Sequence, residues 1–370
     1  MRVLFSCGGT AGHITPAIAI AEALIKKHPD WEVIFVGTPT GMERKIVSAL
    51  GYPFYSIPSM GLQRRLTLKN LRAAATAITS IHKAKRLLTA LAPSAVVGTG
   101  GYACWPTLRA ANTLGIPTLL HESNAMPGLA VRRLEGRVSR LLLNFEESKQ
   151  YLRAPHNSLV IGNPLRVDFS AHTKEEARRA LGIAKGSFLL VSFGGSRGAT
   201  ALNTVMPDFM RLFSLKEGSV MHLHGVGADG GACLADFNKV KCSGGGRIRV
   251  ETYLSDMPLW LRAADLAITR AGAMTLSELA FAACPAILIP SPFVADDHQT
   301  KNALLYKERG AAILLPEKEL TASHLARTVK AIFSSRSKRE EMQRQMRALS
   351  VDKAAEKAVR EIEFFCLTDS

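Results

Sequence analysis

The sequence predicts an α/β fold made of two halves, each built around a parallel β-sheet, and three observations support this prediction. Short β-branched runs alternate with helical patterns almost throughout the chain, which is typical of βαβ units. A glycine-rich phrase occurs twice, at 6–12 and at 192–198, each time between a strand-like and a helix-like run. The 370 residues are enough for two domains that each bury a core.

The hydrophobic pattern gives the expected elements of both halves in order. In the first half we expect strands at 2–6, 32–36, 94–98, 117–121, 139–143 and 158–161. Helical patterns follow near 16–28, 42–50, 69–91, 103–114 and 126–134. In the second half, strands are expected at 187–193, 219–223, 247–250, 265–269, 286–289 and 311–315, and helices near 199–213, 256–263, 274–283 and 298–309. Beyond about residue 320 only helical patterns remain.

Turn chemistry between the halves indicates where the domains divide. The segment Gly162–Asp168 begins with Gly-Asn-Pro and is the expected hinge. We therefore expect an N-terminal domain over 1–163 and a C-terminal domain over 164–350. The last expected helix, near 352–366, lies far along the chain from the second sheet, which leaves open that it packs back on the N-terminal domain.

The composition limits the candidate ligands and the cellular compartment of the protein. A net charge of +16 favours anionic small molecules or lipids, whereas nucleic acid is disfavoured because no basic stretch carries interleaved aromatic residues. The six cysteines include no Cys-x-x-Cys pair, which predicts neither a disulfide framework nor a zinc site and fits a reducing compartment. The chain start does not resemble a signal peptide, and no apolar run approaches the roughly 20 residues of a membrane span. We therefore expect a cytosolic protein that is able to sit on a membrane surface.

The two glycine-rich turns suit an anion, because backbone N–H groups point outward where a strand meets a helix N-terminus. A dinucleotide-binding turn would need glycines at 8, 10 and 13, but Thr10 and His13 occupy two of these positions. The strand at 32–36 also lacks the acidic residue that holds a ribose hydroxyl, and no Gly-x4-Gly-Lys-Ser/Thr motif occurs. A nicotinamide-dependent enzyme and an NTP hydrolase are therefore disfavoured.

Three features of the first half are candidates for chemistry. His13 follows the first turn and is either a general base or a helix-capping residue, with Pro16 in the first turn of the helix. The quartet 121–124 follows a strand, where polar side chains face the ligand crevice of an open sheet, although simple helix capping is the alternative. The loop 98–102 either approaches a ligand closely or is a tight turn without one.

The second half offers a nucleotide-binding pattern. Small residues at the helix start within Thr269–Glu278 would let a diphosphate approach backbone N–H groups. Glu278 either accepts hydrogen bonds from a ribose diol or is an ordinary solvated helix residue. The polar cluster Asp297-His298-Gln299 with Asn302 suits sugar hydroxyls, which need both donors and acceptors.

Together these motifs resemble those of GT-B glycosyltransferases. Within that group the pattern is similar to the N-acetylglucosaminyltransferases that convert lipid I to lipid II in peptidoglycan synthesis. The match covers nearly the whole chain in order and runs through Gly8–His13, Gly100–Tyr102, His121–Asn124, Gly162–Arg166, Gly194–Ala199, Arg270–Glu278, Asp297–Gln299 and Asn302. The resemblance implies two Rossmann-like domains facing a central cleft, and an inverting transfer of GlcNAc from UDP-GlcNAc.

The resemblance also implies roles for single residues. The donor UDP-GlcNAc would be held by Thr10, Ala11, Gly12, Asn124, Arg166, Ser196, Leu254, Ala273, Met274, Thr275, Leu276, Ser277, Glu278 and Gln299. Within this set Glu278 would meet the ribose, Leu254 the uracil region, Arg166 the nucleotide, and Asn124 and Gln299 the sugar. The acceptor lipid I would meet Gly100, Gly101, Tyr102 and His121. His13 is the expected catalytic base, with Glu122 as the competing candidate.

The sequence departs from the usual motifs at three positions. Ala11 stands where glycine is usual, and Ser123 and Arg197 stand where glutamine is common. Because alanine tolerates positive φ poorly, we expect a slightly reshaped first loop, and Arg197 would add a charge beside the diphosphate. No Asp-x-Asp pair occurs in the nucleotide-binding loops, so no metal and no cofactor is expected.

The sequence alone does not decide the role of the excess positive charge or the identity of further partners. The stretch 63–69 leads into a helix that bears Arg72, Lys83, Lys85 and Arg86, which either lies on anionic lipid or covers the sheet. A polyprenyl-linked acceptor would favour peripheral attachment to the cytoplasmic face of the cell membrane, with other cell-wall synthesis proteins as further candidate partners. The alternatives are a glycerolipid glycosyltransferase of the same fold, a UDP-GlcNAc 2-epimerase, and a non-catalytic membrane-surface protein.

Overall fold

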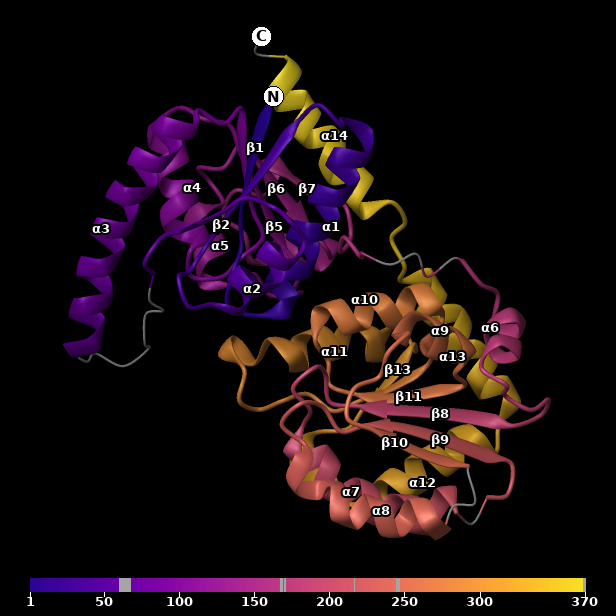
Figure 1. The fold of residues 1–370 in the computed structure, drawn as a ribbon. Coiled ribbons are helices and arrows are strands. Elements are labelled where there is room, and N and C mark those ends of the chain that lie inside the picture. Colours follow the sequence, from indigo (N-terminus) through magenta and orange to yellow (C-terminus); the bar gives the residue numbers. More distant parts are fainter. Residues whose placement is uncertain (60–67, 167–168, 170, 216, 244–246, 369–370) are drawn as a thin grey trace. The chain divides into compact units, whose positions relative to one another are not determined.

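A computed structural model describes the chain except for residues 60–67, 167–168, 170, 216, 244–246 and 369–370. The chain divides into two compact units (Figure 1). The first comprises Met1–Arg166 together with Val351–Ser370, and the second comprises Val167–Ser350. The expected division after residue 163 lies slightly before the observed one.

The first unit is built on a parallel sheet. Its described residues form seven strands in the order β3-β2-β1-β4-β5-β6-β7. The strands are β1 (Arg2–Ser6), β2 (Glu32–Gly37), β3 (Phe54–Ser56), β4 (Ala95–Gly98), β5 (Thr118–Glu122), β6 (Arg140–Leu143) and β7 (Ser158–Val160). All neighbouring pairs are parallel. The chain order reverses between β1 and β4, and open α/β sheets bind ligands at the carboxyl ends of such strands.

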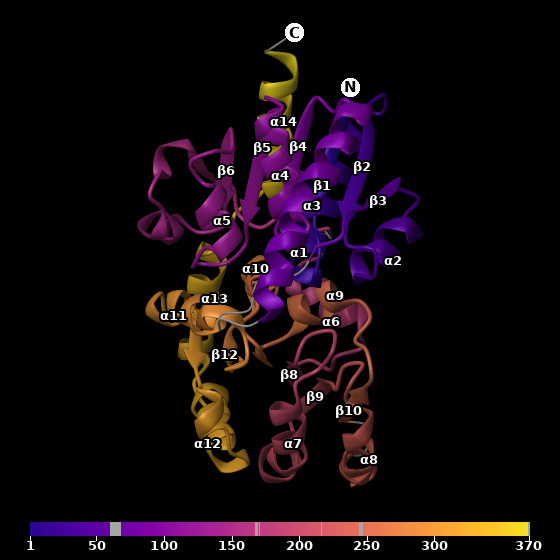
Figure 2. The ribbon, with the colours of Figure 1, turned by 90° about the vertical axis from the view of Figure 1, so that its left-hand side faces the viewer.

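Helices cover both faces of this sheet (Figures 1 and 2). They are α1 (Ala11–Lys27), α2 (Met42–Ala49), α3 (Leu68–Leu91), α4 (Cys104–Thr113), α5 (Leu129–Leu134) and α14 (Ala354–Leu367). Side chains alternate along β1 as the pleat requires. Phe5 lies in a core with Ile18 and Val359 from α1 and α14, whereas its neighbour Leu4 lies in a second core with Leu108 from α4.

The start of α1 corrects two expectations. The helix begins at Ala11 rather than near 16, so Pro16 is buried inside the helix and not in its first turn. Ala11 does not have a positive φ, since the left-handed residue of this loop is Gly9, at φ 88°. The expected reshaping of the loop by alanine was therefore wrong, because a first helical residue needs no glycine.

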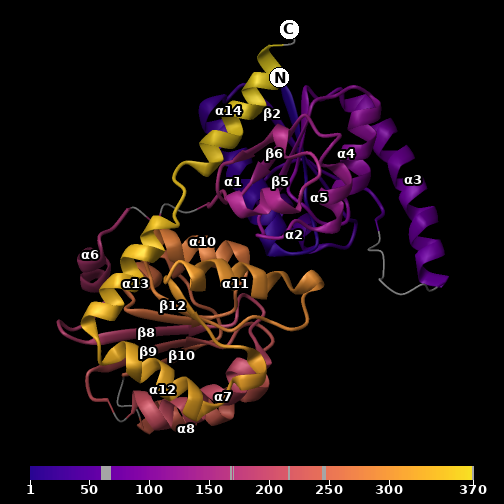
Figure 3. The ribbon, with the colours of Figure 1, turned by 180° about the vertical axis from the view of Figure 1, so that it is seen from behind.

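The C-terminal helix α14 packs against α1 of the first unit (Figure 3). The carboxylate of Glu363 pairs with Lys27 at 2.6 Å and with His28 at 2.5 Å. On the same helix, Glu361 pairs with Arg140 of β6 at 2.7 Å. The fold therefore returns the end of the chain to the first unit, an arrangement that the sequence left open.

The second unit repeats the plan of the first. Among its described residues six parallel strands run in the order β10-β9-β8-β11-β12-β13. They are β8 (Phe188–Phe193), β9 (Val220–Gly225), β10 (Ile248–Glu251), β11 (Leu266–Thr269), β12 (Ala286–Leu288) and β13 (Ala312–Leu314). The chain order reverses between β8 and β11, which sets the switch point of this sheet. The expected α/β fold class with two parallel sheets is thus confirmed.

Helices also cover both faces of the second sheet (Figures 1 and 3). One face carries α7 (Thr200–Phe209), α8 (Leu234–Ser243) and α12 (Ala322–Phe333). The other carries α9 (Met257–Ala263), α10 (Ala273–Ala282), α11 (His298–Glu308) and α13 (Arg336–Ala348), with α6 (Lys174–Ala180) packed on α9.

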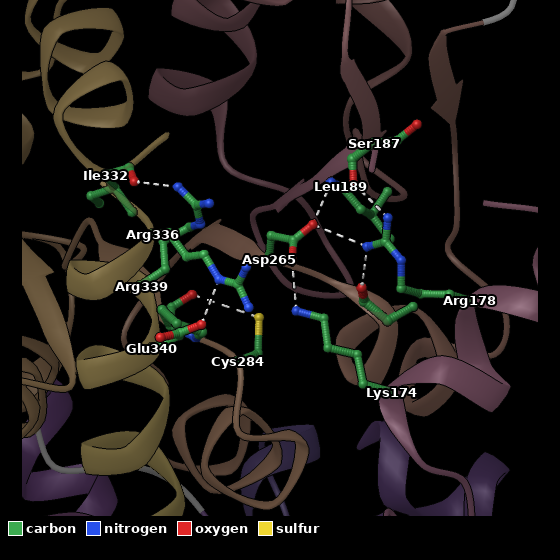
Figure 4. A network of polar contacts seen from close by, with 12 residues as sticks. Lys174, Arg178, Ser187, Leu189, Asp265, Cys284, Ile332, Arg336, Arg339 and Glu340 are labelled. Carbon is green, nitrogen blue, oxygen red and sulfur yellow. Dashed lines mark hydrogen bonds and ion pairs between the residues drawn. The ribbon is translucent and has the colours of Figure 1, made fainter. Parts of the chain in front are cut away.

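A partly buried ion-pair network fastens α6 to the sheet (Figure 4). Asp265, just before β11, accepts hydrogen bonds from Lys174 Nζ at 2.7 Å and from Arg178 Nη1 at 3.0 Å. Its other contact is the backbone N–H of Leu189 in β8, at 2.8 Å. Because Asp265 and Leu189 lie at the amino ends of their strands, this network is at the sheet edge opposite the glycine-rich turns. We therefore assign it a structural role.

Candidate active site

In the first unit, two glycine-rich loops meet at the switch point. Ser6 of β1 and Gly98 of β4 are paired neighbours, so the loops that follow these strands start side by side. Gly101, at φ 88°, lies so close to the backbone of Gly8 that a Cβ atom on it would overlap the Gly8 carbonyl. Glycine is therefore required there for close backbone approach as well as for its conformation.

His13 lies next to this junction, in the first turn of α1. Its Nδ1 lies 2.9 Å from the carbonyl oxygen of Gly8, and Thr99 Oγ1 donates to the His13 carbonyl at 2.6 Å. A carbonyl only accepts, so Nδ1 carries the proton and Nε2 keeps its lone pair. The ring also packs on Gly100, where an added Cβ would lie 2.9 Å from Nε2. The arrangement therefore places a proton on Nδ1 and makes Nε2 the nitrogen that is available to act as a base.

His121 and Glu122 end β5 and are both buried. Burial, assisted by the nearby His13, lowers the pKa of His121 to about 4, although Nε2 donates to the Gly162 carbonyl at 3.2 Å. Glu122 uses both carboxylate oxygens on its own loop. Oε1 accepts from the N–H of Asn124 at 2.9 Å, and Oε2 accepts from the N–H of Gly128 at 2.8 Å, where α5 begins.

Glu43 is a residue of this region that the sequence did not single out. It lies in the first turn of α2, is fully buried, and its carboxylate reaches the first glycine-rich loop. Oε1 accepts from Thr38 N–H at 2.8 Å and Thr38 Oγ1 at 2.6 Å, while Oε2 accepts from Gly9 N–H at 3.3 Å. Burial opposes ionisation, but these hydrogen bonds outweigh it and lower the pKa of Glu43.

In the second unit, the loops after β8 and β11 also start side by side, because Phe193 pairs with Thr269. The loop 194–198 is held by the segment after β9: Ala228 N–H donates to the Ser196 carbonyl at 3.1 Å, and Asp229 N–H to the Arg197 carbonyl at 3.0 Å. Arg197 also pairs with Asp229 at 2.8 Å. The charge that Arg197 adds to this loop is therefore shared with a neighbouring carboxylate.

A buried polar network lies beneath that loop. Ser192 Oγ contacts His222 Nε2 at 2.8 Å and His224 Nδ1 at 2.7 Å, while His224 Nε2 meets Asn203 Oδ1 at 3.2 Å. Asn203 in turn donates to the Val226 carbonyl at 2.9 Å, next to the loop. Burial lowers the pKa of His224 to about 3 and holds that of His222 well below its usual value, so both histidines are neutral in the folded protein.

The third glycine-containing turn leads into α10, where Gly272 is the N-cap and the first turn holds no acidic side chain. That composition leaves the positive end of the helix dipole uncompensated by the helix itself, which suits an anion. One turn further, burial raises the pKa of Glu278 to about 7. Asn302 donates to the Ala271 carbonyl at 3.2 Å and steadies the turn.

Other predicted donor residues lie near the same sheet edge. Gln299 Oε1 accepts from Ser291 N–H at 2.9 Å, which leaves its amide nitrogen as a donor. Leu254 packs against Gly225 at the end of β9, where a Cβ would lie 2.8 Å from Leu254 Cγ. Arg166 belongs to the first unit and pairs there with Glu22 of α1 at 2.7 Å. The predicted donor set is thus divided between the units.

The remaining predicted features are Tyr102, the basic stretch, and the membrane and metal expectations. Tyr102 is 58% exposed on its loop. Most of the basic stretch 63–69, and the side chain of Arg72, lie outside the described residues. Within the described ranges, no helix is long and apolar enough to cross a membrane, and no cluster of histidine, cysteine, aspartate or glutamate could hold a metal ion.

Comparisons with known proteins agree with this architecture. The glycosyltransferase family 28 N-terminal domain matches residues 3–142, and the family 28 C-terminal domain matches residues 189–358. The chain is 40% identical over 365 residues to the UDP-N-acetylglucosamine–N-acetylmuramyl-(pentapeptide) pyrophosphoryl-undecaprenol N-acetylglucosamine transferase of Desulforudis audaxviator, covering 98% of both chains. It is 37% identical to the transferase of the same name from Caldanaerobacter subterraneus, covering 95% of this chain and 96% of the relative.

Solved structures point the same way. The MurG structure from Acinetobacter baumannii matches with a TM-score of 0.78 and 26% identity, covering 98% of this chain and 99% of the other. A UDP-N-acetylglucosamine 2-epimerase from Listeria monocytogenes, described as putative, matches with a TM-score of 0.70 but 14% identity over 100% of this chain and 97% of the other, so it shares the fold alone. The resemblance inferred from the motifs is confirmed, and the chain belongs to glycosyltransferase family 28, among relatives of MurG.

Proposed function

We propose that this chain transfers GlcNAc from UDP-GlcNAc to lipid I, forming lipid II in peptidoglycan synthesis. The observation that carries the proposal is its similarity, at 34–40% identity over nearly the full chain, to curated transferases named for this donor and acceptor. The site geometry supports it, because both sheets present glycine-rich loops and helix N-termini at their switch points.

The second unit supplies most of the residues that bind the donor. The N-terminal turn of α10, over Ala273–Ser277, receives the diphosphate together with Ser196 on the loop after β8. Glu278 accepts hydrogen bonds from the ribose diol, Leu254 lies at the uracil, and the Gln299 amide nitrogen donates to the sugar. As UDP leaves, negative charge grows on the diphosphate, and the helix dipole stabilises it without a metal ion.

The first unit binds the acceptor and removes its proton. The acceptor hydroxyl forms a bond to the anomeric carbon while the bond from that carbon to the UDP oxygen breaks, which inverts the centre. His13 Nε2 takes the hydroxyl proton, since the Gly8 carbonyl keeps the proton of the ring on Nδ1. The loops bearing Gly100–Tyr102 and His121 receive the acceptor diphosphate and sugar, and Thr10–Gly12 stay with the predicted donor set.

Glu122 is better suited to holding its loop than to proton transfer, because both oxygens already accept N–H groups from Asn124 and Gly128. The two residues are separated by the pH profile of kcat at saturating UDP-GlcNAc and acceptor, where protonation of Glu278 in the free protein does not limit the rate. Glu122→Gln should lower the rate yet keep the acidic limb of the profile, whereas His13→Gln should remove that limb. Loss of the limb in Glu122→Gln alone would make Glu122 the base.

The reaction itself is tested with purified protein, UDP-GlcNAc and a lipid I analogue. We expect UDP release that depends on the acceptor, together with a lipid II product. Release of ManNAc without acceptor would replace this proposal with the epimerase reaction, whose enzymes share the fold. Transfer to a diacylglycerol acceptor instead of the lipid I analogue would indicate the glycerolipid transferase.

We also place the protein at the cytoplasmic face of the membrane as a peripheral protein. On α3 the buried positions Ser80, Ala84 and Leu88 face the domain, whereas Ile78 is 71% exposed and Lys83 is exposed beside it. Arg86 is also exposed and lies between Ile78 and Lys83 around the helix, so the exposed side of α3 carries two cations and an apolar residue, which suits anionic headgroups. Vesicles containing anionic lipid should sediment the wild type more than Ile78→Ser, and equal sedimentation with neutral vesicles would contradict the assignment.

A further inference from the structure

One buried carboxylate that is not assigned to a substrate contacts the first glycine-rich loop. Glu43 is buried, and three glycines, one in the first glycine-rich loop, one at the end of β2 and one at the N-cap of α2, make room for it. A Cβ on Gly8 would lie 2.8 Å from its Oε1, and a Cβ on Gly37 or Gly41 would also collide with the side chain. Burying an ionised carboxylate is costly unless hydrogen bonds compensate it, so its position calls for an explanation.

Thr38 binds one oxygen of Glu43, and the other oxygen reaches the peptide group between Gly8 and Gly9. The N–H of Gly9 donates to Glu43 Oε2 at 3.3 Å, and the carbonyl of the same peptide, from Gly8, accepts from His13 Nδ1 at 2.9 Å. Because a peptide group is planar, its N–H and C=O point in opposite directions, and fixing one fixes the other. Glu43 and His13 therefore clamp the peptide from its two sides.

This peptide needs such a clamp because glycine does not specify its orientation. Gly9 has φ 88°, in the region where glycine moves most freely, and Gly8 also lacks a side chain. If the peptide rotated, the Gly8 carbonyl would turn away from His13, and Nδ1–H would lose the nearer of its two oxygen neighbours, the other being Thr10 Oγ1 at 3.5 Å.

We propose that Glu43 is a positioning residue for catalysis, which orients the Gly8–Gly9 peptide and thereby keeps Nε2 of His13 unprotonated and aimed at the acceptor hydroxyl. The catalytic part rests on the proposed transfer reaction. The coupling between Glu43 and the His13 tautomer does not, since it concerns the protein without substrate.

The test uses the full chain and reads the tautomer directly. Imidazole ¹⁵N chemical shifts of His13, assigned by comparison with His13→Gln, should show the Nδ1–H form in the wild type. Glu43→Gln is the informative variant, because the amide has a single oxygen. In the wild type the N–H groups of Thr38 and Gly9 bind separate oxygens of Glu43. We expect the variant to lose the longer bond, to Gly9, and to populate both tautomers.

Activity should follow the tautomer. In Glu43→Gln we expect kcat with a lipid I analogue to fall about 10- to 100-fold while KM for UDP-GlcNAc stays within about twofold. Thr38→Val removes one hydrogen bond to the same carboxylate and should give a smaller effect of the same kind. Glu135→Gln is the matched control, since Glu135 is also buried and accepts a backbone N–H, from Arg153 at 3.0 Å.

The outcomes separate this inference from the proposed function. A folded Glu43→Gln that keeps the pure Nδ1–H tautomer would overturn the coupling, as would a wild type with the proton on Nε2. If Glu43→Gln fails to fold, Thr38→Val decides by the same two readouts. A tautomer change in a protein that transfers no sugar to lipid I would support the coupling and refute the proposed function.

Discussion

Lowering the pH should weaken the binding of UDP-GlcNAc through Glu278. Burial raises the pKa of this carboxyl to about 7, so the free protein holds a proton there in mildly acidic solution. A ribose diol donates hydrogen bonds and therefore favours the ionised carboxylate. Binding must then expel the proton, and the affinity falls as the pH falls below about 7.

The magnitude follows from that pKa. At about pH 8 roughly one tenth of the free protein is protonated at Glu278, and at about pH 6 roughly nine tenths, so the dissociation constant should rise about tenfold between them. UDP-GlcNAc is the right ligand because its diphosphate is esterified at both ends and lacks the terminal phosphate pKa near 6. Titration calorimetry in buffers of different ionisation enthalpy should show release of about 0.9 proton at about pH 6.

Two variants make this prediction refutable. Glu278→Gln cannot titrate, so its affinity should be flat over the same range and no proton should be released. Glu308→Gln, at an exposed position of α11, should behave as the wild type. An affinity that is flat in the wild type, or that keeps its slope in Glu278→Gln, would show that Glu278 does not meet the ribose.

Two further predictions concern stability. His224 is neutral in the folded core but titrates near 6.5 when unfolded, so acidification to about pH 5 should cost about 2 kcal/mol through this residue. Urea unfolding of the wild type and His224→Gln, compared at about pH 8 and about pH 5, isolates that loss. An equal change in the free energy of unfolding in both proteins would contradict it. Gly101→Ala should lower the free energy of unfolding by more than about 2 kcal/mol, since the new Cβ meets the Gly8 backbone. Gly115→Ala, also at positive φ but in open space, should lower it by about 1 kcal/mol. Equal shifts of the thermal midpoint would refute the packing argument.

Much of the fold was predictable because each buried parallel strand is a short apolar run followed by a turn. The strand β3 escaped prediction, since it is a three-residue edge strand whose Tyr55 is exposed. Helix α6 also escaped, because its sequence is almost entirely polar, although Thr173 and Glu176 form a capping box that could have identified its start. The early start of α1 was hidden because Gly12 suggests a loop, while Thr10 is a recognised N-cap type.

The site was predictable as a set of loops but not as a set of contacts. Glycine-rich turns after strands indicated two anion-binding loops, and the observed strand order puts each of them at a switch point. The roles of Glu122 and Glu43 depend on which atoms their carboxylates reach, and Glu43 meets a loop more than 30 residues earlier in the chain. His222 and His224 share one face of β9, a spacing that the sequence shows, yet only the fold reveals that this face is buried.

The division of work between the two units is tested most directly by His13→Gln, measured for both donor binding and transfer. We expect the dissociation constant of UDP-GlcNAc to stay within about twofold of the wild-type value, because most of the predicted donor residues lie in the second unit and His13 is not among them. Formation of lipid II from lipid I should fall at least about 100-fold, as expected when a general base is lost. Undiminished transfer, or loss of donor binding in step with transfer, would contradict the assignment of His13 as the base that acts on the acceptor.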